Sequence, residues 1–246
     1  MYVNTTGIVL RETAYKDSSK ILTVLTGDEG KKTVTARGAL RRNSKLAAVT
    51  QLLVLSEMTL FSSRDRWTLT EARSIEQFAG LRDDITFIAL GAYFAELTEA
   101  VADEDSPNPE LLPLLCNALY ALSEKIKTPG FVKPAFELRL MAVSGFAPRL
   151  EHCAVCGRSE PEQAFLDYTG GTVCCSGCTN AEGAELSGGA LQAARFIVGC
   201  DSKKLLSFSV SDKALSELAR ATQGYLLAHL DRRFRTLDYY HAINLQ

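Results

Sequence analysis

The spacing of apolar residues changes once along this chain of 246 residues, near residue 80. Before that point, apolar and β-branched residues alternate with polar ones in short stretches, which is the pattern of strands. There are five such stretches: Tyr2–Ala14, Lys20–Thr26, Lys31–Arg37, Thr50–Ser63 and Arg66–Phe78. Turn residues such as Gly27-Asp28-Glu29-Gly30 separate them, so five strands in about 80 residues predict a small barrel. An OB-type barrel is the leading interpretation, and an SH3-like barrel is the alternative on strand count.

From about residue 81 the apolar period lengthens to three or four residues, as in helices that pack on a core. Helices are predicted around Phe87–Val101, Leu115–Leu122 and Phe136–Val143, and again at about 188–199, 211–230 and 231–243. Segment 150–184 has neither a helical nor a strand-like pattern, so we interpret it as an insert. The predicted fold class is α+β: a barrel domain at 1–80 and a helical domain at 81–246 that carries the insert.

The insert contains two closely spaced cysteine pairs, Cys153 with Cys156 and Cys175 with Cys178, with 18 residues between the pairs. Four thiolates in two tight turns suit tetrahedral zinc, and a site closed by four sulfurs is structural, not catalytic. We therefore predict one structural Zn(II) ion in a zinc finger. Cys174 leaves an alternative open, since it would give the second turn three intervening residues. The two remaining cysteines, Cys116 and Cys200, lie in apolar helical surroundings and are predicted to be inert.

The charge of the chain is unevenly distributed. Lysine and arginine total 27 against 29 acidic residues, but residues 1–80 carry a net +4 and the remainder a net −6. Between Gly30 and Lys45 the chain has no acid and six cations, namely Lys31, Lys32, Arg37, Arg41, Arg42 and Lys45. On a barrel these residues would form one strand and the loop after it, so the cations would line one groove and bind phosphates. A merely solvated loop is the alternative.

No catalytic motif is evident. The three histidines do not form a metallohydrolase pattern, and the chain lacks both a P-loop and a Gly-x-Gly-x-x-Gly motif. We therefore predict that the protein is not an enzyme. The first residues have no basic start followed by an apolar core, and no apolar stretch reaches about 20 residues, so a cytoplasmic location is expected. In a reducing cytosol a cysteine cluster favours metal binding over disulfides.

Several segments, taken in order, resemble one known family. They are Gly7–Leu10 with Tyr15–Thr26, the basic loop Ala36–Lys45, Phe136–Leu140 with Gly145–Pro148, the cysteine module Cys153–Cys178 with Gly170-Gly171, and Tyr225–Leu230 with Arg235–Leu237. Their order and spacing resemble the bacterial recombination mediator family RecO, over nearly the whole chain. The Gly-Gly-x-x-Cys spacing of that family points to Cys174 as the third zinc ligand, whereas the two-residue turn points to Cys175.

The resemblance implies an N-terminal OB fold, a helical domain and an inserted zinc finger. It also implies a protein that binds single- and double-stranded DNA, anneals complementary strands and, with RecR, helps to load RecA onto single strands coated by single-stranded-DNA-binding protein. Association with the nucleoid during repair would follow. Lys133 and Arg139 are candidates to rim a groove for the acidic tail of that binding protein. The alternative function is a zinc-ribbon adaptor that binds only protein.

Overall fold

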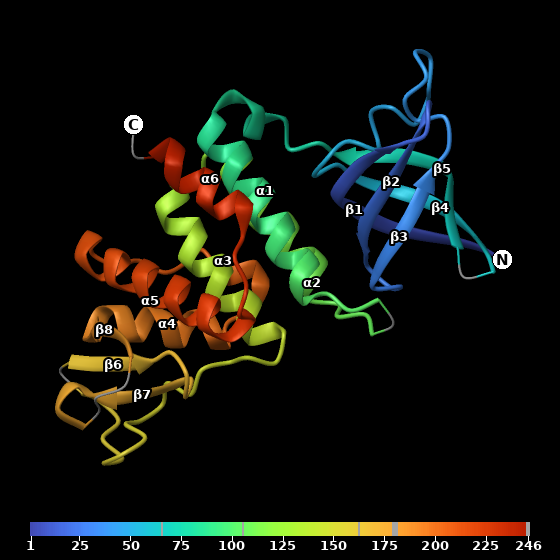
Figure 1. Ribbon diagram of the computed structural model, residues 1–246. Helices are drawn as coiled ribbons and strands as arrows, with labels where there is room; N and C mark the ends of the chain where they lie inside the picture. Colours follow the sequence, from blue (N-terminus) through green and yellow to red (C-terminus); the bar gives the residue numbers. More distant parts are fainter. Residues whose placement is uncertain (65, 105, 162, 179–181, 245–246) are drawn as a thin grey trace. The chain divides into compact units, whose positions relative to one another are not determined.

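The computed structural model describes residues 1–64, 66–104, 106–161, 163–178 and 182–244. The chain forms two compact units, one of residues 1–124 with 234–246 and one of residues 125–233. In the described residues, the first unit contains the barrel and helices α1, α2 and α6, and the second contains α3, α4 and α5 (Figure 1). Both cysteine pairs belong to the second unit. The division into a DNA-binding domain at 1–80 and a helical domain at 81–246 stays a prediction.

The barrel consists of β1 (Tyr2–Tyr15), β2 (Ser19–Thr26), β3 (Lys31–Ala36), β4 (Leu55–Ser63) and β5 (Arg66–Glu76). It is closed in the order β1-β2-β3-β5-β4, and β3 and β5 run parallel, with Val34 paired to Trp67. Alternate residues point inward, so Val9, Leu22, Val34, Met58 and Leu60 are almost fully buried in one core. The predicted five-stranded barrel is confirmed.

The fourth strand begins at Leu55, five residues later than the predicted Thr50. The apolar residues before it fold into turns: the amide of Thr50 donates to the carbonyl of Leu46, and Leu53 has a φ of 65°. Leu53 and Val54 are buried and exchange backbone hydrogen bonds with Val9, where the register of β1 shifts. The apolar run therefore reflects burial in a loop, which the alternation pattern could not separate from a strand.

Three helices complete the first unit: α1 (Ile85–Val101), α2 (Leu111–Ser123) and α6 (Arg235–Asn244), with a short 3-10 turn at Ala79–Asp83. The side chain of Asp84 accepts a hydrogen bond from the amide of Thr86 and caps α1. The last helix returns to the first, since the rings of Tyr93 and Phe234 meet edge to face with centroids 6.0 Å apart. This helix starts four residues later than predicted because Asp231 adopts a left-handed conformation that ends α5.

The second unit contains α3 (Pro129–Val143), α4 (Gly188–Gly199) and α5 (Asp212–Leu230), with short 3-10 turns at Ser176–Cys178 and Ser202–Lys204. It also contains a sheet of β6 (Gln163–Asp167), β7 (Thr172–Cys175) and β8 (Gly183–Ser187), in the order β7-β6-β8. The interpretation of segment 150–184 as lacking strands was therefore wrong. Each of these strands has four or five residues, and β6 buries only Ala164 and Leu166 fully, too few for a recognisable alternation.

Most of α3 is buried, including its charged residues. Lys133 forms an ion pair of 2.7 Å with Glu137, and the other carboxylate oxygen of Glu137 accepts a hydrogen bond from Thr222 on α5. Arg139 donates to the carbonyl of Val198. Because Lys133 and Arg139 are at most 9% exposed, neither can rim a surface groove, contrary to the expectation from sequence. No helix in the described part of the chain is long and apolar enough to cross a membrane.

Candidate functional site

The residues after β3 form a basic segment, Arg37–Lys45, that folds back on the barrel through backbone hydrogen bonds. Gly38 has a φ of 70°, a conformation that favours glycine, and the amide of Arg41 donates to its carbonyl. Ala39 is buried in the barrel core, and the amide of Leu40 donates to the carbonyl of Ser18. These contacts hold a surface loop in a defined shape.

Four cations of the basic segment are exposed: Arg37, Arg41, Arg42 and Lys45. Within the described ranges, none of these side chains forms an ion pair with a carboxylate. A guanidinium carries several donors in a planar fork that matches a phosphate, and binding a phosphate here would break no existing ion pair among the described residues. The segment can therefore offer four positive charges to a polyanion.

The other two predicted cations have different surroundings. The ammonium of Lys31 donates to the carbonyl of Glu99 and that of Lys32 to the carbonyl of Glu104, each at 2.8 Å. Lys32 also lies over the ring of Trp67, 5.6 Å from its centroid. These carbonyls lie at and just beyond the C-terminal end of α1, where a positive charge is favourable. The structure thus places Lys31 in a contact that joins β3 to α1, and Lys32 in a contact that joins β3 to the segment after α1.

Two further arginines lie near Arg37 and escaped the sequence reasoning. Arg37, Arg64 and Arg66 line one open groove of about 650 Å³ on the barrel. In the sequence, Arg64 lies between two predicted strands and Arg66 begins the second of them, and neither arginine is among the predicted site residues. The turn could have been recognised as functional because the β4–β5 loop of an OB fold takes part in binding oligonucleotides.

The two cysteine pairs come together in the second unit. The sulfurs of Cys153, Cys156, Cys175 and Cys178 all lie within 4.8 Å of one another. Four sulfurs at about 2.3 Å from a tetrahedral zinc would be roughly 3.8 Å apart, so only small movements separate this cluster from a complete ligand set. The donor set and its spacing therefore fit a thiolate-bound metal.

Hydrogen bonds to sulfur already favour the charged form of one of these thiols. The backbone amides of Cys156 and Cys175 both donate to the Sγ of Cys153, at 3.5 and 3.3 Å. These bonds lower the pKa of the Cys153 thiol to about 5. Removal from water and the neighbouring thiols raise the pKa of Cys175 to about 12. Without a cation, the charge on Cys153 therefore opposes ionisation of its neighbour Cys175. A cation bound between the sulfurs would stabilise all four as thiolates.

The structure places Cys175 in the cluster, and Cys174 lies outside it. Neighbouring residues of a strand point to opposite faces. Cys174 pairs with Phe165 in the sheet and is 5% exposed, whereas Cys175 is partly exposed and lies 3.6 Å from the sulfur of Cys156. Burial also raises the pKa of the Cys174 thiol.

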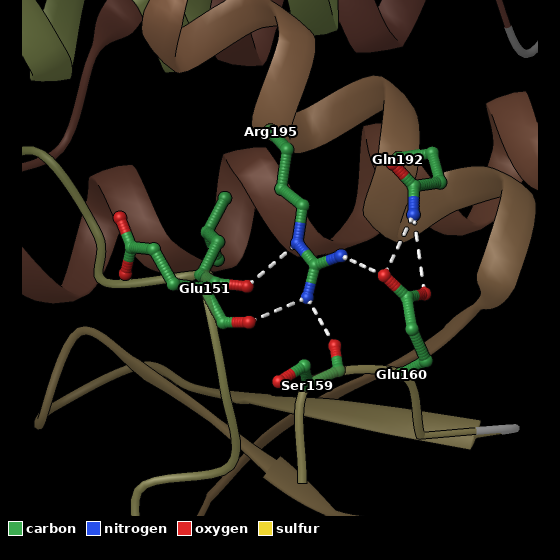
Figure 2. A network of polar contacts seen from close by, with 6 residues as sticks. Glu151, Ser159, Glu160, Gln192 and Arg195 are labelled. Carbon is green, nitrogen blue, oxygen red and sulfur yellow. Dashed lines mark hydrogen bonds and ion pairs between the residues drawn. The ribbon is translucent and has the colours of Figure 1, made fainter. Parts of the chain in front are cut away.

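An arginine on α4, Arg195, contacts the two segments that flank the first cysteine pair in the sequence, and Figure 2 shows these contacts. The guanidinium of Arg195 donates to the backbone carbonyls of Leu150, Glu151 and Ser159 at 2.6–2.9 Å. It also pairs with the carboxylate of Glu160 at 3.0 Å. These carbonyls come from both sides of the Cys153–Cys156 turn, so one side chain closes the loop that carries it. Nothing in the sequence pattern singled out this arginine.

Two family models match the chain and together cover nearly all of it. The model described as Recombination protein O N terminal matches residues 1–78, and that described as Recombination protein O C terminal matches residues 82–238. The N-terminal match, residues 1–78, covers the closed five-stranded barrel. This barrel is the OB-fold domain that the sequence predicted.

Individual relatives agree with the family models. A protein named DNA repair protein RecO from Acetivibrio thermocellus is 33% identical over 240 residues, which cover 97% of this chain and 96% of the relative. Another of the same name from Symbiobacterium thermophilum is 33% identical over 241 residues, 96% of this chain and 95% of the relative. One from Listeria monocytogenes is 36% identical over 168 residues, 68% of this chain and 66% of the relative.

Proposed function

Because the chain belongs to the recombination protein O family of DNA repair proteins, we propose that it is a non-catalytic recombination mediator that binds DNA through the barrel. The observation that carries this proposal is the basic segment. Its four exposed cations, Arg37, Arg41, Arg42 and Lys45, have no carboxylate partner in the described part of the chain. Contacts with phosphates are independent of sequence and serve single and double strands alike.

The proposed roles of the six cations differ. The four cations of the basic segment would bind phosphates directly, and Arg41 with Arg42 would contribute most because both are exposed and adjacent. Lys31 and Lys32 would contribute less, since each already donates to a backbone carbonyl near the end of α1. A phosphate would have to compete with that contact.

Annealing is the second part of the proposal. Two complementary strands repel each other through their phosphates, and a surface that neutralises both backbones lets them approach without a nucleotide cofactor. We further propose that the protein acts with RecR and single-stranded-DNA-binding protein to help load RecA, and does so at the nucleoid. The family membership supports these partners, and the negative charge of residues 81–246 makes that region better suited to protein than to DNA.

A third part concerns the cysteine cluster, which we propose holds one structural Zn(II) ion. Cys153, Cys156, Cys175 and Cys178 would supply four thiolates, which leaves no open position for a reacting water. Bound metal would cross-link the two turns of a small sheet that has little core of its own. The proposed role is stability of this module, with no part in chemistry.

The experiment that tests DNA binding is a double charge reversal, Arg41→Glu with Arg42→Glu, followed by fluorescence anisotropy with a single-stranded oligonucleotide at several salt concentrations. If each arginine neutralises one phosphate, the slope of log affinity against log salt falls by about 1.4. The matched control is Lys203→Glu with Lys204→Glu, which makes the same change in charge at two adjacent exposed lysines of the second unit.

Two results would overturn the proposal. If the wild-type protein shows no salt-sensitive affinity for DNA, the zinc-ribbon adaptor that binds only protein becomes the better function. If both double variants lose affinity equally, the loss reflects net charge and the basic segment is not the contact surface. Loss confined to the Arg41/Arg42 variant supports the assignment.

A further inference from the structure

One row of side chains crosses the outer face of the barrel near the basic segment. The register pairs Tyr2 of β1 with Phe61 of β4, Phe61 with Thr68 of β5, and Thr68 with Thr35 of β3. These residues point outward, because the neighbours of Phe61 and Thr68 within their strands, Leu60 and Leu69, are buried in the core. Four strands thus contribute to one surface.

The row contains two aromatic rings in contact at the surface. The centroids of Tyr2 and Phe61 are 4.9 Å apart with planes inclined by 47°, and Tyr2 is 67% exposed. Met1 fixes the position of this pair, since it exchanges two backbone hydrogen bonds with Ser62 through its ammonium group and its carbonyl. Phe61 is partly buried but is not among the residues of the barrel core, so core packing does not account for the pair.

The aromatic pair lies in the groove that Arg37, Arg64 and Arg66 line, and the described lining includes no carboxylate. Thr68 and Thr70 add hydroxyl groups to it. A second groove on the barrel differs in charge, because Asp28, Glu57 and Glu71 line it with a single arginine, Arg73. The outer surface therefore has one groove suited to an anion with flat apolar parts and another that would repel it.

We infer that the groove formed by Tyr2, Phe61, Arg37, Arg64 and Arg66 binds single-stranded nucleic acid by stacking unpaired bases on the aromatic pair while the arginines bind the adjacent phosphates. The inference rests on the proposed function and adds to it a means of preferring single strands. In a duplex the faces of the bases are already stacked on one another, so a duplex offers this groove only its phosphates. An unpaired base offers a free face as well.

The test uses three probes of equal length: a thymidine oligomer, an oligomer of abasic sites and a blunt duplex. The full-length variants are Tyr2→Ala and Phe61→Ala, with Tyr239→Ala as the control, because Tyr239 is an exposed tyrosine on α6. Anisotropy gives the affinities, and thermal melting of each variant shows whether the barrel is intact. If Phe61→Ala lowers the melting temperature, Tyr2→Ala carries the test alone, since its exposed side chain contributes little to folding.

The expected result is a loss of about five-fold to one hundred-fold in affinity for the thymidine oligomer in Tyr2→Ala and Phe61→Ala. Affinities for the abasic oligomer and the duplex, which depend on phosphates, stay at the wild-type value, as does every affinity of Tyr239→Ala. If wild type binds all three probes but Tyr2→Ala retains full affinity for the thymidine oligomer, the inference fails and the proposed function stands. If wild type binds none of the probes, the proposed function itself fails.

Discussion

Replacing Arg195 by alanine should destabilise the second unit by loosening the loop that carries the first cysteine pair. The guanidinium donates three hydrogen bonds to backbone carbonyls, at 2.7 Å to Leu150, 2.9 Å to Glu151 and 2.6 Å to Ser159. The side chain is only 20% exposed, so these bonds are partly shielded from water. Alanine would remove all three and leave the carbonyls without their donor.

The size of the effect follows from the exposure of each partner. The ion pair with Glu160 contributes little, because that carboxylate is 73% exposed and screened by solvent. Hydrogen bonds from a charged donor are each worth about 1.5–3 kcal/mol when shielded, but water can replace the donor at the exposed Glu151 and Ser159. About 2–3 kcal/mol is therefore expected in total, which lowers the melting temperature of a unit of this size by about 10 °C.

Two measurements on Arg195→Ala check this reasoning. Calorimetry should resolve the lower melting transition, and a colorimetric chelator should withdraw metal faster than from wild type, because the Cys153–Cys156 turn is no longer held on both sides. The control is Arg220→Ala, an exposed arginine on α5 of the same unit. The reasoning is refuted if Arg195→Ala has the same melting temperature as Arg220→Ala and releases metal at the wild-type rate. The network of Figure 2 would then not stabilise the module.

Two pairs of substitutions test the small sheet and the cysteine cluster. A Cβ on Gly183 would lie 2.0 Å from the carbonyl oxygen of Leu166, so Gly183→Ala should cost at least about 2 kcal/mol in urea denaturation. Gly188→Ala, where no atom lies within 4 Å of the added Cβ, should leave stability unchanged or raise it. Cys175→Ser should lose the metal, whereas Cys174→Ser should keep one zinc per chain by elemental analysis; the reverse outcome would make Cys174 the ligand.

Much of the architecture could be predicted because it depends on local patterns. The five strands appear as alternation along the sequence, and the helices at 188–199 and 211–230 appear as a period of three to four residues. Where an element is short the pattern fails. β6, β7 and β8 have at most five residues each, and the residues before Leu55 are apolar because they are buried in turns.

The candidate site divides in the same way. The Cys-x-x-Cys pairs and the run of cations at 31–45 are close in sequence, so spacing alone indicated a metal and a polyanion. The sequence could not show which of these cations remain available to bind a phosphate. The backbone carbonyls that Lys31 and Lys32 contact lie 68 and 72 residues further along the chain. Arg195 was missed for the same reason, since it contacts carbonyls 36–45 residues away.

The sequence by itself determined the class of the fold and the number of barrel strands. It also indicated the cysteine cluster, with Cys174 and Cys175 as alternatives for one position. Each of these features depends on residues close together in the sequence. The tertiary structure placed Cys175 in the sulfur cluster and Cys174 outside it, because the two residues lie on opposite faces of β7. It also brought Tyr2 of β1, Phe61 of β4 and three arginines into one groove, with the arginines coming from the residue after β3, the β4–β5 turn and the start of β5. Such a surface depends on the register of strands far apart in sequence, and register is settled only when the barrel closes.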